Sequence, residues 1–420
     1  MKKYLYFIAS ITLFSSCKLA EYPNSLVTPS IKNVSQTNLH FGDQITITGE
    51  NFDEIKSNNQ VHLSGVEATI VNASKTTLTV LVPEVKVKRT TITVKNKNGE
   101  ANSDTISYTP DVFLAEVERG TEMDFFRLWK NGVPSLILQG NSFAFPKLYI
   151  NGNDIYVITG KGTFIPPTTY KRAAKLLKNG QEIYSSNLPY SESIRNVLVS
   201  NGNLYFTTFT SAQELPKNNL NVYKNGTIIQ SITISNGYPC DFLVVNNDVY
   251  VSAYGYNGSE YLWKNGSPIR LEGTVNMPFT TVTAMKYKNG DLYMLGSIRT
   301  DINKQEQKLV LWKNGTPSVI DENVSQSAGL QLDGNDVYIS ATILNNTYRF
   351  GTKFWKNGKT IGEYKDSPES TTFKVFDGDV YSTNQNPSFP YSNYMFNFGQ
   401  IVVREQSANS FSFILDIVVR

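Results

Sequence analysis

Residues 283–321 read TAMKYKNGDLYMLGSIRTDINKQEQKLVLWKNGTPSVID, and this stretch contains the pattern that decides the fold. It holds four strand-like runs, at 283–288, 292–298, 308–313 and 318–321. Asn289-Gly290 joins the first two runs, and Asn314-Gly315 joins the last two. Asn-Gly between two strands is a strong hairpin signal, because a type I′ turn needs a positive φ at both central residues. The stretch therefore predicts two hairpins, which supply four antiparallel strands.

The same pattern recurs along residues 111–420. The tripeptide Lys-Asn-Gly follows an aromatic or aliphatic residue at Trp129, Leu177, Tyr223, Trp263, Trp312 and Trp355. A second signature, a turn pair followed by an apolar residue and tyrosine, ends at Tyr156, Tyr205, Tyr250, Tyr293, Tyr338 and Tyr381. The period of roughly 40 to 50 residues is typical of β-propeller blades. We therefore expect a β-propeller over 111–420.

The two ends of this segment complete one another. Residues 112–115 occupy the second-strand position of a blade but have no first strand before them. Residues 394–399 are a degenerate copy of the Trp-Lys-Asn-Gly strand, and one spare strand follows them at 410–419. The count predicts seven blades, with the C-terminal strand closing the ring against 112–116 and removing exposed sheet edges. The blades resemble β-propellers in architecture only, since they carry no WD, kelch or sialidase signature, and architecture does not imply function.

Residues 29–109 predict a separate small β-sandwich. Apolar and polar residues alternate in short runs, for example at 45–48 and 78–82, and turn residues such as Gly42-Asp43 separate them. The stretch GDQITITGENF at 42–52, with Val82-Pro83 and the closing Tyr108, resembles the IPT/TIG immunoglobulin-like domain. That resemblance implies a spacer that holds another domain away from a membrane.

The N-terminus predicts an export signal. Met1-Lys2-Lys3 precedes an apolar run that is too short for a transmembrane helix, and Leu13-Phe14-Ser15-Ser16-Cys17 follows it. This stretch resembles a bacterial lipoprotein signal with a lipobox of the looser Bacteroidota kind. The resemblance implies that residues 1–17 are the signal with its lipobox, that Cys17 carries the lipid anchor and that 18–28 form a tether. It also implies an outer-membrane lipoprotein of the cell envelope, with exposure at the cell surface left open. The alternative is an ordinary signal peptide in which Cys17 is incidental.

Composition excludes several classes of function. Lys and Arg number 39 against 36 Asp and Glu, a formal net charge of +3, so we expect no nucleic-acid partner. Both histidines, His40 and His62, lie in the predicted sandwich, and we expect neither a metal site nor a cofactor. Without a histidine or a singled-out pair of carboxylates, the propeller is not expected to be an enzyme. Cys240 is expected to be a small buried side chain rather than a nucleophile.

Candidate binding residues lie on the face opposite the Asn-Gly hairpins, where the loops vary in length. Exposed aromatic rings can stack on sugars while neighbouring amides bind the hydroxyl groups. The candidates are Tyr254, Tyr256, Tyr348, Phe389 and Tyr391. The alternative is that these rings pack loop against loop. We expect the tryptophans to pack between blades and the six lysines of Lys-Asn-Gly to be solvated charges at the turns.

These observations predict a non-catalytic binding module for polysaccharide or glycoconjugate, carried on an immunoglobulin-like spacer. The layout resembles the surface glycan-binding lipoproteins of Bacteroidota uptake systems. One alternative is a protein–protein scaffold or adhesin accessory at the outer membrane, whose partner would be another envelope protein. A third is a propeller-type glycan hydrolase or lyase. The membrane would be contacted through the lipid anchor only.

Overall fold

The computed structural model describes residues 27–119, 124–140, 147–165, 169–186, 192–210, 218–234, 237–256, 261–275, 277, 279–301, 306–344, 350–364, 372–385, 393–397, 400–403 and 411–420. Within them the regular elements are strands and one 3₁₀ turn, η1 (Lys56–Asn58). The chain divides into two compact units. One comprises Met1–Pro83 and Arg89–Ser107, and the other comprises Glu84–Lys88 and Tyr108–Arg420.

The smaller unit is the predicted β-sandwich. One sheet has the order β1 (Ser30–Val34), β3 (Gln44–Glu50), β7 (Thr77–Leu81), β6 (Thr69–Ala73). A second has the order β10 (Gly99–Asn102), β9 (Ile92–Asn96), β4 (Gln60–Leu63), β5 (Val66–Glu67), and a short third sheet pairs β2 (Asn38–Leu39), β11 (Ile106–Tyr108) and β8 (Arg89–Thr90). Alternate residues such as Ile45, Ile47, Leu78 and Val80 are fully buried. The period-two pattern therefore gives one face of each strand to the core.

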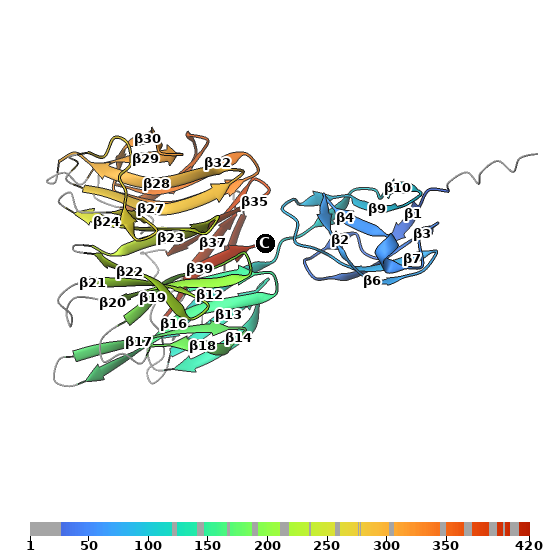
Figure 1. Ribbon diagram of the computed structural model, residues 1–420, viewed down its shortest axis with the longest axis horizontal. Helices are drawn as coiled ribbons and strands as arrows, with labels where there is room; N and C mark the ends of the chain where they lie inside the picture. The colour runs from blue at the N-terminus through green and yellow to red at the C-terminus, as the bar shows by residue number, and fades with distance from the viewer. Residues whose placement is uncertain are drawn as a thin grey trace, which may run out of the picture. The chain divides into compact units, whose positions relative to one another are not determined.

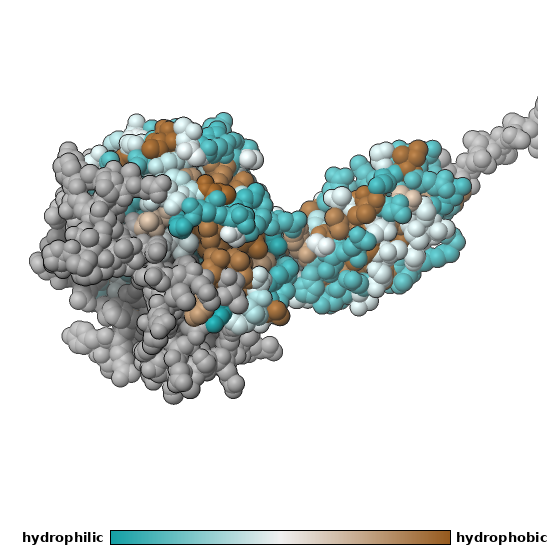
Figure 2. Space-filling model, turned by 90° about the horizontal axis from the view of Figure 1, so that it is seen from below, coloured by the Kyte–Doolittle hydropathy of each residue, from teal (hydrophilic) through white to brown (hydrophobic). Residues whose placement is uncertain are grey.

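The surface of the sandwich unit is mixed in character. Figure 2 shows hydrophobic residues scattered among hydrophilic ones over this unit. Among the described large apolar side chains of the sandwich unit, that of Ile55 is the most exposed, at 61%. Single exposed apolar residues of this kind are ordinary on protein surfaces and mark no binding site.

The larger unit is a β-propeller built of consecutive four-stranded antiparallel sheets (Figure 1). The first two are β15 (Lys147–Asn151), β16 (Asp154–Ile165), β17 (Thr169–Lys178), β18 (Gln181–Ser185), and β19 (Glu192–Ser200), β20 (Asn203–Thr210), β21 (Asn218–Lys224), β22 (Thr227–Ile234). The last two are β31 (Gln326–Asp333), β32 (Asp336–Leu344), β33 (Phe350–Lys356), β34 (Lys359–Tyr364), and β35 (Phe373–Phe376), β36 (Asp379–Gln385), β37 (Asn393–Asn397), β38 (Gln400–Val403).

Between these sheets, two sets of four strands join into one eight-stranded sheet. The sets are β23 (Pro239–Val245), β24 (Asp248–Tyr256), β25 (Leu262–Lys264), β26 (Ser267–Pro268), and β27 (Phe279–Lys288), β28 (Asp291–Arg299), β29 (Gln307–Lys313), β30 (Thr316–Val324). They join because the end of β24 pairs with the start of β27, with Tyr254 opposite Thr281. Residues 250–252 of β24 pair with β25, whereas residues 254–256 pair with β27.

The C-terminal strand closes the propeller. β39 (Phe411–Val419) pairs with β12 (Val112–Arg119), which continues into β13 (Asp124–Lys130) and β14 (Val133–Gly140). Val112 lies opposite Val419, so the predicted closing pair is confirmed. The first strands contact one another in the order β39, β15, β19, β23, β27, β31, β35, and β35 contacts β39 again. The all-β fold with a sandwich and a propeller is thus confirmed, and the count of seven blades stays a prediction.

The Lys-Asn-Gly turns have the predicted backbone and an additional anchor. Asn314 and Gly315 have φ values of 51° and 89°. Asn314 Oδ1 accepts the backbone N–H of Leu292 at 2.8 Å, and its Nδ2 donates to Asp291 Oδ1 at 2.7 Å. Lys313 Nζ lies 2.7 Å from Asp291 Oδ2. Each turn is therefore tied to the start of the second strand of its own sheet.

The same anchor corrects our expectation for the six lysines. Five of them form ion pairs with an aspartate at the start of the second strand, so they are not simply solvated charges. The pairs are Lys130–Asp111, Lys178–Asp154, Lys264–Asp248, Lys313–Asp291 and Lys356–Asp336. In the sixth copy Asn203 replaces the aspartate, and it keeps the hydrogen bond from Asn225 Nδ2 at 2.8 Å.

Three of the four tryptophans pack in the core as predicted, whereas Trp129 is half-buried and its Nε1 donates to Glu116 Oε2 at 2.7 Å. Trp312 and Trp355 are 0% and 1% exposed, and Trp263 is 5% exposed. Trp312 lies in one apolar cluster with Leu262 of β25 and Val282 of β27, so the cluster joins the two sets of four strands that make up the eight-stranded sheet. Burial between sheets is what stabilises a propeller, because each sheet contributes half of every such core.

Candidate functional site

One of the five predicted aromatic residues has a described side chain. Tyr254 lies near the end of β24, at the opposite end of that strand from the Asn246-Asn247 hairpin, and thus on the predicted loop-bearing face. Tyr256 belongs to the same strand, but its side chain lies outside the described residues. Tyr348, Phe389 and Tyr391 also lie outside the described residues, and so does Cys17.

The half-buried Tyr254 side chain is held by contacts with two further strands. Gln326 Nε2, at the start of β31, donates a hydrogen bond to Tyr254 Oη at 2.5 Å. The Tyr254 ring lies 6.3 Å from the ring of Phe279 at an angle of 39°. Phe279 is buried beneath the guanidinium group of Arg299, which lies 4.8 Å from the Phe279 ring centre. An aromatic ring and a side-chain amide are thereby fixed next to each other on this face.

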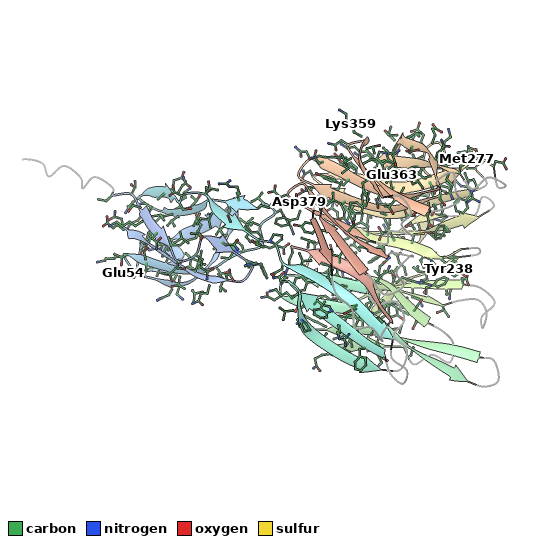
Figure 3. The ribbon with its side chains drawn as sticks, turned by 180° about the vertical axis from the view of Figure 1, so that it is seen from behind. Glu54, Tyr238, Met277, Lys359, Glu363 and Asp379 are labelled. Carbon is green, nitrogen blue, oxygen red and sulfur yellow. The ribbon has the colours of Figure 1, made fainter. Side chains whose placement is uncertain are left out.

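A second aromatic residue at this position was not predicted. Tyr238, labelled in Figure 3, is 55% exposed, and its carbonyl oxygen accepts the backbone N–H of Tyr254 at 3.1 Å. Gly237 makes this approach possible, because a Cβ there would lie 2.3 Å from the Tyr254 carbonyl oxygen. The sequence signal was an aromatic residue in the loop Asn236-Gly237-Tyr238-Pro239. We call Tyr238, Tyr254, Phe279 and Gln326 the Tyr254 cluster.

Cys240 follows this loop but has no nucleophilic character. Its Sγ lies 3.8 Å from Thr281 Oγ1 and 3.7 Å from the carbonyl oxygen of Tyr238. Burial raises the pKa of the Cys240 thiol to about 12. The thiol is therefore protonated at neutral pH, and only thiolates are effective nucleophiles.

The described part of the chain contains no group of three or more His, Cys, Asp or Glu residues that could hold a metal ion. Nor does any helix within it have the length and apolar character needed to cross a membrane.

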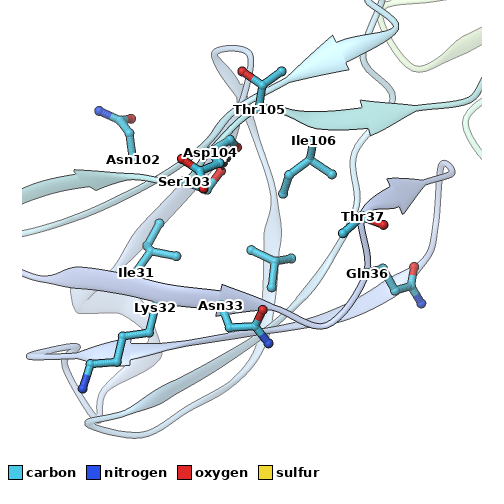
Figure 4. Close-up of a pocket in the computed structure, with 11 residues that line it drawn as sticks. Ile31, Lys32, Asn33, Gln36, Thr37, Asn102, Ser103, Asp104, Thr105 and Ile106 are labelled. Carbon is cyan, nitrogen blue, oxygen red and sulfur yellow. Dashed lines mark hydrogen bonds between the residues drawn. The ribbon is translucent and has the colours of Figure 1, made fainter.

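The sandwich unit contains a pocket of its own, of about 250 Å³ (Figure 4). Strand β1 with the turn that follows it forms one wall, and Asn102–Ile106 forms the other. The lining is largely polar and includes both Lys32 and Asp104. Such a lining can take up water or a small polar molecule, but it offers no aromatic surface for a sugar ring.

Comparison with known proteins identifies the class of the sandwich unit. Residues 29–110 match the IPT/TIG domain model, which confirms the predicted resemblance for this segment. No curated protein matches the chain.

Solved structures resemble the chain at low sequence identity. A protein of unknown function from Bacteroides thetaiotaomicron VPI-5482 has 11% identity and a TM-score of 0.50, with 86% of this chain and 96% of that chain covered. An auxiliary nutrient binding protein from Bacteroides ovatus ATCC 8483 has 12% identity and a TM-score of 0.29, with coverage of 84% and 94%. The β-propeller domain of the Trilobed protease from Pyrococcus furiosus has 13% identity and a TM-score of 0.39, with coverage of 63% and 86%. The likeness to the Bacteroides thetaiotaomicron protein, at 11% identity, is evidence for the fold alone.

Proposed function

We propose that this chain is a cell-envelope lipoprotein that binds polysaccharide or glycoconjugate without catalysis, through the loop-bearing face of its propeller. The observation that carries the proposal is the Tyr254 cluster, where the half-buried Tyr254 side chain is bonded to the Gln326 amide. The backbone of Tyr254 is bonded to that of the exposed Tyr238, whose ring lies 5.8 Å from the Phe209 ring. The sequence offers Tyr256, Tyr348, Phe389 and Tyr391 as further candidates for the same role.

Carbohydrate recognition needs the chemistry that this cluster offers. A tyrosine ring presents a flat apolar face to the C–H groups of a sugar, and its hydroxyl group adds a polar contact. The Gln326 amide can bind sugar hydroxyl groups through its carbonyl oxygen while its Nε2 stays bonded to Tyr254. Because that hydrogen bond holds the Gln326 side chain in place, less side-chain entropy is lost when a ligand binds to its carbonyl oxygen.

In this proposal the other parts of the chain hold the binding surface at the cell envelope. In the proposed arrangement Cys17 carries the lipid, residues 18–28 form the tether, and the IPT/TIG domain is the spacer. The whole then displays the propeller at the outer membrane.

A glycan array probed with the full chain carrying Cys17→Ser tests the proposal. The substitution removes the lipid attachment site and leaves the remaining sequence unchanged. We expect binding to one class of polysaccharide. A protein that melts cooperatively but binds no glycan would reject the proposal and favour the protein–protein scaffold.

A further inference from the structure

Six charged side chains on the first strands of the propeller lie close enough to influence one another: the charges of Asp416, Asp241 and Arg195 act on Lys147, and those of Asp416, Lys286, Asp241 and Lys147 act on Lys374. These strands contact one another in a closed order. The side chains are those of Lys147 (β15), Arg195 (β19), Asp241 (β23), Lys286 (β27), Lys374 (β35) and Asp416 (β39). Four cations therefore face two carboxylates in this set, which we call the axial cluster. Glu192 of β19 is directed elsewhere, because the Tyr184 hydroxyl group of β18 donates to its carboxylate at 3.1 Å.

Both carboxylates of the axial cluster are already bound by backbone groups. Asp241 Oδ2 accepts the backbone N–H of Met285 at 2.6 Å, and Asp416 Oδ2 accepts that of Leu148 at 2.8 Å. Asp416 Oδ1 also accepts the N–H of Ile417 at 2.9 Å. The bonds to Met285 and Leu148 join β23 to β27 and β39 to β15, which are neighbouring first strands. The two aspartates thus act as clamps between adjacent first strands.

The lysines of the axial cluster lack a close counterion within the described part of the chain. Lys147 Nζ donates to the Arg195 carbonyl oxygen at 3.0 Å and to Asn196 Oδ1 at 3.3 Å, both neutral acceptors. Among the described residues, Lys286 and Lys374 take part in no hydrogen bond and in no ion pair within 4.0 Å. Arg195, in contrast, lies 5.1 Å above the Phe209 ring.

The surroundings of Lys147 and Lys374 disfavour the charged form of these two side chains. Burial lowers the pKa of Lys147 and Lys374, although the charges of Asp416 and Asp241 act in the opposite direction. The Lys147 side chain is nevertheless solvent exposed, so water reaches it. Cations that are partly desolvated and lack a counterion are costly, and an anion between them removes that cost.

We propose that the axial cluster binds an oxyanion, through Lys286, Lys374 and Lys147. A carboxylate, sulfate or phosphate group presents several strong acceptors to ammonium donors that come from different strands. The group could be part of an acidic sugar or a free inorganic anion. The site does not depend on glycan binding at the Tyr254 cluster, since the two share no residue.

Calorimetric titration of the full chain carrying Cys17→Ser with sodium phosphate, sodium sulfate, glucuronate and neutral glucose tests this site. We expect at least one of the three anions to bind, glucose not to bind at the axis, and the affinity to fall as KCl is added. Glucuronate binding would identify an acidic sugar as the source, and phosphate or sulfate binding alone would identify an inorganic anion.

Lysine variants then locate the site. Lys286→Gln and Lys374→Gln should each weaken anion binding at least about tenfold. Lys359→Gln is the matched control, because Lys359 is an exposed residue of the outer strand β34 (Figure 3) and its loss changes the net charge equally. It should leave binding unchanged.

Thermal melts provide a second readout that does not depend on the affinity of a variant. The anion that binds should raise Tm of the parent protein by about 3 °C and that of Lys374→Gln by much less. Failure of all three anions to bind, or an equal loss of affinity in Lys359→Gln and Lys374→Gln, would overturn the axial site. Either result would leave glycan binding at the Tyr254 cluster unaffected.

Discussion

Asn314 Nδ2 donates a hydrogen bond to Asp291 Oδ1 at 2.7 Å, across a separation of 23 residues. The bond links the turn after the third strand of a propeller sheet to the start of the second strand. Equivalent bonds join Asn131 to Asp111, Asn179 to Asp154, Asn265 to Asp248 and Asn357 to Asp336. The repeated tripeptide is therefore one half of a structural anchor, and the aspartate is the other half.

Removing the turn amide should destabilise the propeller. Asn314→Ala places a residue with a Cβ at a φ of 51° and removes both side-chain hydrogen bonds, so we expect a loss of about 1–3 kcal/mol in the free energy of unfolding. Urea unfolding followed by circular dichroism measures this. Asp291→Asn is the control, because Asn203 already occupies this position in another sheet, and it should change stability little. Equal destabilisation by both variants would contradict this and show that the Lys313–Asp291 ion pair contributes as much as the amide.

The closing strand should be needed for a monomeric propeller. Deletion of β39 would leave β12 with an unpaired edge, and exposed edges pair with other chains. We expect the shortened chain to melt at a lower temperature and to form oligomers in size-exclusion chromatography with light scattering. A shortened chain that stays monomeric with an unchanged melt would contradict the closure.

Trp312 should be among the most costly residues to truncate. Its side chain is 0% exposed, and its Nε1 donates to the carbonyl oxygen of Glu272 at 3.0 Å. Trp312→Ala should lower the unfolding free energy by about 3–5 kcal/mol, whereas Trp312→Phe, which keeps most of the ring volume, should cost less. Denaturant titration of both variants checks the order, and equal costs would mean that the hydrogen bond dominates.

The thiol of Cys240 should react slowly in the folded protein. Burial raises its pKa from 9.0 to about 12, so at pH 8 the thiolate fraction is about a thousandfold below that of an unperturbed thiol. In the chain carrying Cys17→Ser, alkylation by iodoacetamide should therefore be slow at pH 8 and accelerate as the pH rises toward 12 or when urea unfolds the protein. Rapid labelling of the native protein at pH 8 would refute this environment.

The propeller could be predicted because its signals are local. Asn289-Gly290 and Asn314-Gly315 adopt the positive φ values of a type I′ turn. Because such a turn joins two antiparallel strands, the strands on either side of each pair could be predicted to pair with each other. The closing pair could also be predicted, since 112–115 lacked a partner and 410–419 was spare.

What could not be predicted depends on contacts between distant residues. The aspartate partners of the turn lysines were missed because the two residues lie far apart in the chain. They meet only when the second and third strands pair, since one residue begins that hairpin and the other ends it. The axial cluster was missed because its residues come from six different strands, and alternation along a strand does not show which side chains of neighbouring strands meet. Tyr238 was missed because its proximity to Tyr254 arises only when β23 and β24 pair.

The affinity of the propeller for the glycan identified on the array tests the central claim most directly. Tyr238→Ala, Tyr254→Ala and Tyr287→Ala would be compared by calorimetry in the chain carrying Cys17→Ser. Tyr287 is the matched control, because it is 39% exposed on β27 next to the Asn289-Gly290 hairpin, at the opposite end of the strand from the Tyr254 cluster. We predict that Tyr238→Ala or Tyr254→Ala weakens binding about tenfold or more and that Tyr287→Ala does not. Unchanged affinity in both cluster variants would contradict the assignment of this face as the glycan-binding surface.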